Sequence, residues 1–182
     1  MRIITGCARG TKLKTPKGLG TRPTADRVKE SLFSILGTRM EGARVLDLFA
    51  GTGALGLEAL SRGAASTVFV DAATSVLIKQ NALAAKLTDK VEVIGADSFR
   101  MLRRMAQEQR RFDLIFCDPP YNQGHPAAVL ALLDKEMILA DDGILILEYS
   151  RHEPVSDDSL ERLQIARREK YGETMVAFFR YK

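Results

Sequence analysis

Short apolar runs that alternate with helical segments are the feature that most constrains the fold of this 182-residue chain. The runs cover residues 44–49, 68–70, 91–94, 112–117 and 143–148. They are too short for buried helices and rich in branched and aromatic residues, as buried strands are. Helical segments follow the first four runs, ending near residue 62, covering 75–85, ending near residue 108 and covering 127–133. Because strands joined by helices pair in parallel, the pattern predicts an α/β fold with helices on both faces of a parallel sheet.

The two ends of the chain predict additions to this sheet. Two strand-like runs, 163–168 and 175–181, flank Gly172 and favour an antiparallel hairpin at one edge, preceded by a short helix near 156–163. The sheet would then have seven strands and be mostly parallel. At the other end, residues 3–13 favour a small hairpin or an extended arm.

A helix is expected between this arm and the first strand. Thr24 has the side chain of an N-cap, apolar residues follow at helical spacing, and Gly37 should end the helix. We expect a single domain over residues 1–182, in which a basic arm and helix at 1–40 precede a core at 41–182.

Composition excludes several classes of protein. With 46% apolar and 27% charged residues, the chain is typical of globular domains, and no apolar run approaches the roughly 20 residues of a membrane helix. The N-terminus has no apolar stretch of the kind found in signal peptides. The two cysteines, Cys7 and Cys117, form neither a metal-binding spacing nor a disulfide framework. We therefore expect a cytoplasmic protein without a metal.

Positive charge is concentrated at the front of the chain. Residues 1–44 hold ten lysines and arginines and three acidic residues, a net charge of +7, whereas the whole chain carries +4. This asymmetry is typical of a face that binds a polyanion, although any single lysine is more often a solvated surface residue. For the asymmetry as a whole we favour nucleic acid. The candidate contacts are Arg9, Arg22, Thr24, Arg27 and Lys29.

A glycine-rich turn follows the first predicted strand. Gly51, Gly53 and Gly56 open a helix, where the backbone can approach a ligand closely and the helix N-terminus attracts negative charge. Asp71 ends the next strand, where an acid can accept hydrogen bonds from ribose hydroxyls. The pattern favours a nucleotide-type pocket, and an NAD-binding domain stays open as an alternative. Asp47 argues against NAD, because a carboxylate ahead of the glycines suits a cationic amino-acid group instead.

The tetrapeptide Asp118-Pro119-Pro120-Tyr121 follows the fourth predicted strand. In open α/β sheets, ligands bind at this end of the strands. Prolines lack an N–H and have a fixed φ, so they end the strand and leave their carbonyls free to accept hydrogen bonds. The segment therefore offers a carboxylate, a carbonyl and a flat ring in one small space, which suits the planar amine of a nucleobase or an amide. A strand followed by an ordinary Pro-Pro turn is the structural alternative.

Four acids, Asp47, Asp71, Asp97 and Asp118, lie within or at the ends of predicted parallel strands. They should therefore converge on one edge of the sheet. Any of them could instead cap a following helix, an alternative that is strongest for Asp97 and weakest for Asp118.

At this point the sequence resembles a known family. The segments Asp47-Leu-Phe-Ala-Gly51-Thr-Gly53 and Asp118-Pro-Pro-Tyr121 resemble those of the class I S-adenosylmethionine-dependent methyltransferases. More narrowly, the stretches 1–6, 22–33 and 47–60 are similar to those of the bacterial methyltransferases that modify N2 of a guanine in 16S rRNA. Asp71 departs from that family, in which Glu is more frequent at this position, and Thr52 replaces a common Ser.

This resemblance implies a Rossmann-like class I methyltransferase fold and a set of roles. The implied cofactor is S-adenosylmethionine, with the glycine turn and Asp47 around its methionine part, Asp71 at the ribose and Asp97 at the adenine. The implied cofactor-binding set is Asp47, Phe49, Gly51, Thr52, Gly53, Asp71, Asp97 and Asp118. Asp118 and the carbonyl of Pro119 would accept hydrogen bonds from the guanine amine, and Tyr121 would stack on the base.

The implied reaction is an in-line methyl transfer to 16S rRNA, as naked RNA or in a partly or fully assembled small subunit, by a monomer. Alternatives within the enzyme class are methylation of adenine N6 in DNA and of glutamine in a protein. Another alternative is a non-catalytic RNA-binding assembly factor.

Overall fold

The computed structural model describes residues 1–16, 23–121 and 123–182, with the side chains of 23–25 excepted. Helices α1 to α5 span Pro23–Leu36, Ala54–Ser61, Ser75–Ala84, Ser98–Gln107 and His125–Glu136. Single 3-10 turns, η1 and η2, span Gly37–Met40 and Thr88–Lys90. Strands β1 to β7 span Arg44–Leu48, Ser66–Val70, Val91–Ile94, Phe112–Cys117, Leu139–Ser150, Leu163–Tyr171 and Thr174–Tyr181.

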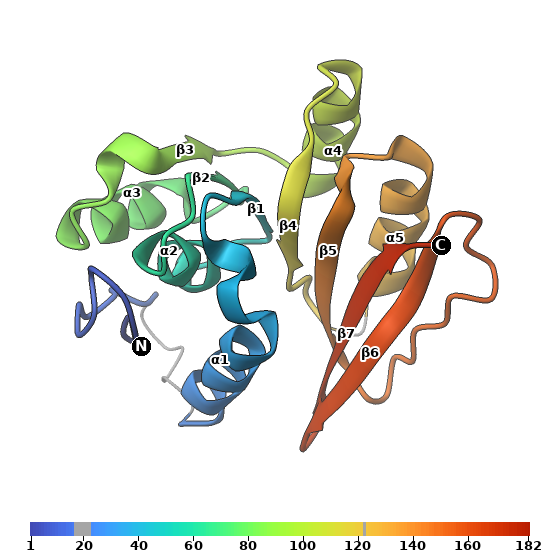
Figure 1. Ribbon diagram of the computed structural model, residues 1–182, viewed down its shortest axis with the longest axis horizontal. Coiled ribbons are helices and arrows are strands. Elements are labelled where there is room, and N and C mark those ends of the chain that lie inside the picture. The colour runs from blue at the N-terminus through green and yellow to red at the C-terminus, as the bar shows by residue number, and fades with distance from the viewer. Residues whose placement is uncertain (17–22, 122) are drawn as a thin grey trace.

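The strands form one sheet in the order β3-β2-β1-β4-β5-β7-β6. Strands β1 to β5 pair in parallel, and β7 runs antiparallel to both β5 and β6, which gives the edge hairpin seen in red in Figure 1. The seven-stranded, mostly parallel sheet predicted from the sequence is therefore confirmed. The direction of strand order reverses between β1 and β4, and this is where open α/β sheets bind ligands.

The predicted short helix near 156–163 is wrong. This segment consists of turns and bends, because side-chain oxygens take up its backbone N–H groups. The carboxylate of Asp134 accepts hydrogen bonds from the backbone of Glu161, Arg162 and Leu163 at 2.7–2.9 Å. Side-chain acceptors of this kind compete with helix formation.

Alternate residues of each central strand enter opposite layers of the core. In β1, Val45 packs with the helices on one side of the sheet, whereas Leu46 and Leu48 pack on the other. The first layer includes α1, whose Phe33 ring lies 5.6 Å from that of Phe116 on β4. The second layer includes α4 and α5, which lie near β4 and β5 in Figure 1. Asp47 therefore faces the first layer, on the side of α2.

The N-terminal residues form the arm predicted from the sequence, closed by an antiparallel bridge between Arg2 and Lys12. Glu58 on α2 fixes this arm by accepting hydrogen bonds from the backbone of Ile4 at 2.8 Å and Thr5 at 3.0 Å. Among the described residues, no helix is both long enough and apolar enough to cross a membrane.

Candidate functional site

A cleft of about 730 Å³ lies at the C-terminal ends of β1, β2, β3 and β4. It brings together six of the residues singled out from the sequence: Phe49, Asp71, Asp97, Asp118, Pro119 and Tyr121. Ala72, Ala73, Thr74, Ser98 and Pro120 complete its lining. The volume falls in the range of small-molecule and cofactor pockets. The four segments meet because parallel strands end at the same edge of a sheet.

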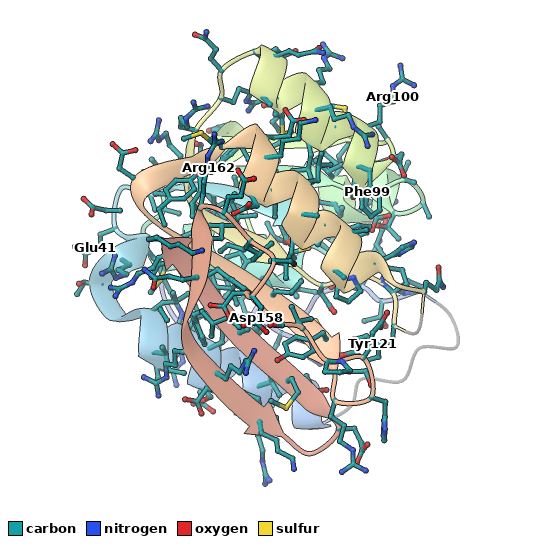
Figure 2. The ribbon with its side chains drawn as sticks, turned by 90° about the vertical axis from the view of Figure 1, so that its right-hand side faces the viewer. Glu41, Phe99, Arg100, Tyr121, Asp158 and Arg162 are labelled. Atoms are coloured by element: carbon teal, nitrogen blue, oxygen red, sulfur yellow. The ribbon has the colours of Figure 1, made fainter. Side chains whose placement is uncertain are left out.

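Asp118 occupies the mouth of this cleft, directly after β4. Among the described residues its carboxylate has no hydrogen-bond partner, in contrast to those of Asp47, Asp71 and Asp97. Pro119 is buried beside it, and Tyr121 is 37% exposed. Figure 2 shows Tyr121 on the same side of the molecule as Phe99. Within the part of the chain that the structure describes, the site thus presents a carboxyl group without a hydrogen-bond partner and a partly exposed aromatic ring.

The surroundings of Asp118 favour its protonated form. Its carboxyl is open to the cleft but enclosed by protein on the other sides, and this desolvation raises its pKa well above the usual range. The nearby acids Glu148 on β5 and Asp47 on β1 raise that pKa further. Glu148 is half-buried and accepts a hydrogen bond from the Tyr121 hydroxyl at 2.8 Å. Sequence reasoning missed Glu148, although this acid ends the apolar run predicted as the fifth strand, 143–148.

Asp71 joins the second strand to the glycine turn. One of its oxygens accepts a hydrogen bond from the backbone of Gly51 at 2.9 Å. The other accepts from the backbone of Ala73 and Thr74, both at 2.9 Å. A carboxylate has about four lone-pair sites, so Asp71 keeps capacity for a ligand hydroxyl in the cleft that it lines.

Asp47 and the glycine turn do not line the cleft. Asp47 is 3% exposed, and its carboxyl accepts a hydrogen bond from the backbone of Gly56 at 2.9 Å, in the first turn of α2. Burial is the main reason why its pKa rises to about 8, and the charge of Asp71 adds to the effect. Gly51 and Gly53 have positive φ angles of 54° and 76°, which turn the chain sharply from β1 into α2. Asp47 thus holds the start of α2, and any effect on a ligand passes through this turn.

Asp97 combines the two roles considered for it. Its side chain caps α4, accepting a hydrogen bond from the backbone of Arg100 at 2.8 Å, and it also lines the cleft. Phe49, which lines the cleft, belongs to an aromatic cluster with Phe99 and His125, of which only Phe49 was among the predicted site residues. The His125 ring is stacked on Phe49 with centroids 6.2 Å apart and lies edge-on to Phe99 at 5.5 Å.

The candidate nucleic-acid contacts differ in their surroundings. Arg9 and Arg27 are exposed. The prediction that Lys29 contacts nucleic acid is wrong, because this residue is 4% exposed and forms an ion pair with the fully buried Glu58 at 3.4 Å. Arg22 lies outside the described residues, and the side chain of Thr24 is likewise not described.

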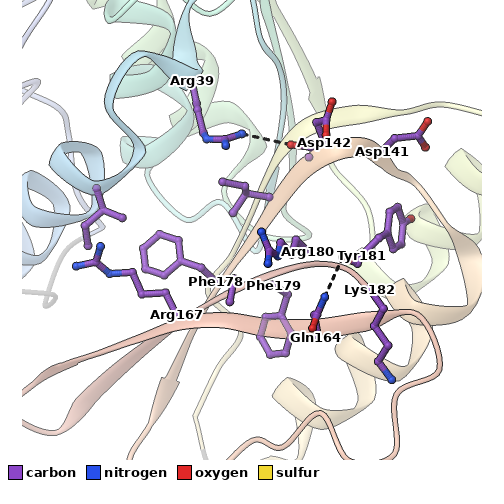
Figure 3. Close-up of a pocket in the computed structure, with 14 residues that line it drawn as sticks. Arg39, Asp141, Asp142, Gln164, Arg167, Phe178, Phe179, Arg180, Tyr181 and Lys182 are labelled. Atoms are coloured by element: carbon purple, nitrogen blue, oxygen red, sulfur yellow. Dashed lines mark hydrogen bonds between the residues drawn. The ribbon is translucent and has the colours of Figure 1, made fainter.

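A second pocket of about 540 Å³ lies beside the N-terminal part of β5 and the edge hairpin. Figure 3 shows arginines and acidic residues around it, with Arg39 donating a hydrogen bond to the carbonyl of Asp142 at 3.4 Å. None of the residues predicted from the sequence lines this pocket, and its opposed charges favour no single ligand.

Comparison with known proteins identifies the family. The family described as Conserved hypothetical protein 95 matches residues 1–180. This chain belongs to that family. Its fold is that of the class I S-adenosylmethionine-dependent methyltransferases, as the resemblance implied.

Relatives in this family are named as rRNA methyltransferases. YlbH from Bacillus subtilis, a candidate rRNA methyltransferase, is 40% identical over 182 residues, covering 99% of this chain and 98% of that protein. Ribosomal RNA small subunit methyltransferase D from Escherichia coli is 39% identical over 151 residues, or 81% of this chain and 74% of that protein. The solved structure of the methyltransferase candidate yhhF from Escherichia coli matches with a TM-score of 0.86 at 33% identity, covering 100% of this chain and 98% of that chain.

Proposed function

We propose that this protein transfers a methyl group from S-adenosylmethionine to the N2 amine of a specific guanine in 16S rRNA. The carboxyl group of Asp118, which lines the cleft together with Pro119 and Tyr121, is the observation that carries this proposal. The names of the relatives from Bacillus subtilis and Escherichia coli support an rRNA substrate.

The residues of the cleft fit S-adenosylmethionine. Asp71 offers acceptors for ribose hydroxyls, Phe49 offers an apolar surface, and Asp97 offers an acceptor for the adenine amine. The turn between β1 and α2 would support the cofactor indirectly. Its shape is fixed by Asp47, Gly51, Thr52 and Gly53. When bound, S-adenosylmethionine supplies an electrophilic methyl group on its sulfonium.

The protein would contribute orientation and electrostatic stabilisation rather than a covalent intermediate. The lone pair of an exocyclic amine is delocalised into the ring, so the amine is a weak nucleophile. In the proposed mechanism Asp118 and the Pro119 carbonyl accept the two amine hydrogens, which favours a pyramidal nitrogen and aims its lone pair at the methyl. Tyr121 stacks on the base, which must leave its own stack to enter the cleft. Asp118 then accepts the surplus proton of the methylated nitrogen.

The RNA would lie against the basic N-terminal segment, residues 1–44. Arg9 and Arg27 are exposed there and remain proposed contacts, together with Arg22 and Thr24. We propose that a partly or fully assembled small subunit helps to present the base to a monomeric enzyme. A ribosomal substrate would place the reaction in the bacterial cytoplasm.

Methyl transfer from labelled S-adenosylmethionine to small subunits that lack the modification tests this function. We expect N2-methylguanosine at one site, and a loss of rate on the order of 100-fold or more in Asp118→Ala. Asp113→Ala is the matched control, because Asp113 lies at the opposite end of β4 and pairs with Arg44. Calorimetry with S-adenosylhomocysteine should give tight binding to the wild type and to Asp113→Ala, and weaker but measurable binding to Asp118→Ala, whose side chain is lost from the lining of the cleft.

The outcomes separate the alternatives. Wild-type rates in Asp118→Ala would refute the role given to that residue. Absence of methylguanosine together with intact binding of S-adenosylhomocysteine would refute the substrate and make DNA adenine the next one to test. Binding of NAD instead of S-adenosylhomocysteine would refute the cofactor.

A further inference from the structure

Glu148 stands beside the site without a role in the mechanism above. Cys117 on β4 is paired with Leu147 on the neighbouring parallel strand β5, so the next positions are Asp118, directly after β4, and Glu148 on β5. Since Cys117 and Leu147 both pack in the layer of α4 and α5, the residues that follow them both face the opposite layer. The two acids are therefore neighbours on the same face of the sheet.

A hydrogen bond of Tyr121 also links the end of β4 to β5. It belongs to the loop after β4, and its hydroxyl donates a hydrogen bond to Oε1 of Glu148 at 2.8 Å. The hydroxyl of Thr174, at the start of β7, is its second hydrogen-bond partner. A partly exposed ring on a loop would otherwise be free to rotate, and hydrogen bonds to an ionised acceptor are stronger than those between neutral groups.

We propose that Glu148 is a positioning residue of this site: its carboxylate holds the Tyr121 ring at the mouth of the cleft and forms an acid pair with Asp118. The inference rests on the proposed function, in which Tyr121 stacks on the base and Asp118 accepts hydrogen bonds from it. It adds a residue from β5 to a site otherwise made from the ends of β1 to β4.

The acid pair has a consequence for pH dependence. The charges that raise the pKa of Asp118 belong to Glu148 on β5 and Asp47 on β1, and the Tyr121 hydroxyl faces both Glu148 and Asp118. Asp118 can accept the surplus proton of the amine only when it is ionised, so activity should rise as pH passes its pKa. Replacing Glu148 by Gln removes one like charge and should lower that pKa. The acid limb of the rate profile should therefore move to lower pH.

Kinetics of Glu148→Gln, Tyr121→Phe and the double variant test the positioning role. We expect each single variant to lower kcat on the order of tenfold, with little change in the affinity for S-adenosylhomocysteine, because Glu148→Gln makes the acceptor of the Tyr121 hydrogen bond neutral and weaker and Tyr121→Phe removes the donor. The double variant should be no slower than either single one, since both changes act on the same hydrogen bond. Only the variants that lack Glu148 should shift the acid limb. Wild-type kcat in Glu148→Gln, or losses that multiply in the double variant, would overturn the proposal.

Glu148→Asp separates the two parts of the role. It keeps the charge beside Asp118 but shortens the reach to Tyr121, so kcat should fall while the acid limb stays at the wild-type pH. An acid limb that moves in Glu148→Asp as far as in Glu148→Gln would contradict the acid pair.

NMR titration of the Asp118 carboxyl carbon measures the effect of Glu148 on the pKa of Asp118 without the need for catalysis. The apparent pKa should be lower in Glu148→Gln than in the wild type, whereas in the exposed control Glu173→Gln it should not change. Equal values in wild type and Glu148→Gln would overturn the acid pair even if the protein methylates a different substrate. If the wild type is inactive but the apparent pKa of Asp118 is still lower in Glu148→Gln, the proposed function would be refuted and the acid pair would stand.

Discussion

At the residue scale, Glu58 shows how much one buried acid can organise. It is fully buried, accepts hydrogen bonds from the backbone of Ile4 and Thr5, and pairs with Arg62 at 2.8 Å and with Lys29 at 3.4 Å. Burial lowers the pKa of Lys29, and the charge of Glu58 opposes this effect. Four groups from three segments thus depend on a single carboxylate.

Glu58→Ala should therefore destabilise the protein strongly. Removing Glu58 leaves the buried Lys29 ammonium without its counter-charge, with the carbonyl of Arg2 as its remaining acceptor, and takes the acceptor from two part-buried backbone N–H groups. Loss of one partner of a buried ion pair costs about 3–5 kcal/mol. Urea unfolding measures this change in the free energy of unfolding. Glu108→Ala is the matched control, because Glu108 pairs with Arg104 on an exposed helix surface and should cost at most about 0.5 kcal/mol. Equal losses in the two variants would contradict this account.

At the scale of elements, the N-terminal arm is joined to both α2 and the glycine turn. The amide of the fully buried Asn81 on α3 accepts a hydrogen bond from the backbone of Lys14 at 2.8 Å and donates to the carbonyl of Thr52 at 2.9 Å. On α2, the Ser61 hydroxyl accepts from the backbone of Ala8 at 2.9 Å. Through Asn81, the N-terminal arm therefore shares a contact with the glycine turn that precedes α2.

Gly6→Ala and Gly10→Ala should differ in how far they release this arm. Both glycines have positive φ angles, 88° and 85°, so each alanine costs about 1–2 kcal/mol of backbone strain. Only at position 6 would the new Cβ lie 1.8 Å from the carbonyl oxygen of Ser61, whereas nothing lies within 4 Å at position 10. We expect Gly6→Ala to speed tryptic cleavage at Lys12 and Lys14 well beyond Gly10→Ala. Similar cleavage rates would mean that the contact with Ser61 does not hold the arm.

At the scale of the whole molecule, acids with raised pKa values on one face of the sheet make stability depend on pH. Burial raises the pKa of Asp47 from 3.8 to about 8, and the pKa values of Asp118 and Glu148 are raised as well. At pH values between the pKa of such an acid in the unfolded chain and its raised pKa in the folded protein, the folded protein keeps a proton that the unfolded chain has released. The free energy of unfolding should therefore fall as pH rises from about 4 to about 8.

Asp47→Asn tests this dependence. The amide oxygen can still accept the hydrogen bond from Gly56, but the side chain no longer titrates. We expect urea unfolding between pH 5 and pH 8 to give a steeper decline of stability in the wild type than in the variant. Parallel declines would show that Asp47 does not contribute to the pH dependence.

The sequence by itself determined the order of the elements and the acids at their ends. The strands at 91–94 and 112–117 coincide with β3 and β4, because an apolar run with sharp polar limits is a local signal. The gathering of Asp71, Asp97 and Asp118 in one cleft follows from the same pattern, since parallel strands end at one edge.

Only the tertiary structure decided what each charged side chain touches. Lys29 is a charged residue on an amphipathic helix, and its burial depends on Glu58, which is 29 positions away in the chain. The neighbourhood of Glu148 and Asp118 depends on the register between β4 and β5, which no local pattern encodes. Burial and pairing are sums over distant segments, whereas periodicity is a property of the residues next to one another. For that reason the sequence located the site, and the fold decided which groups act in it.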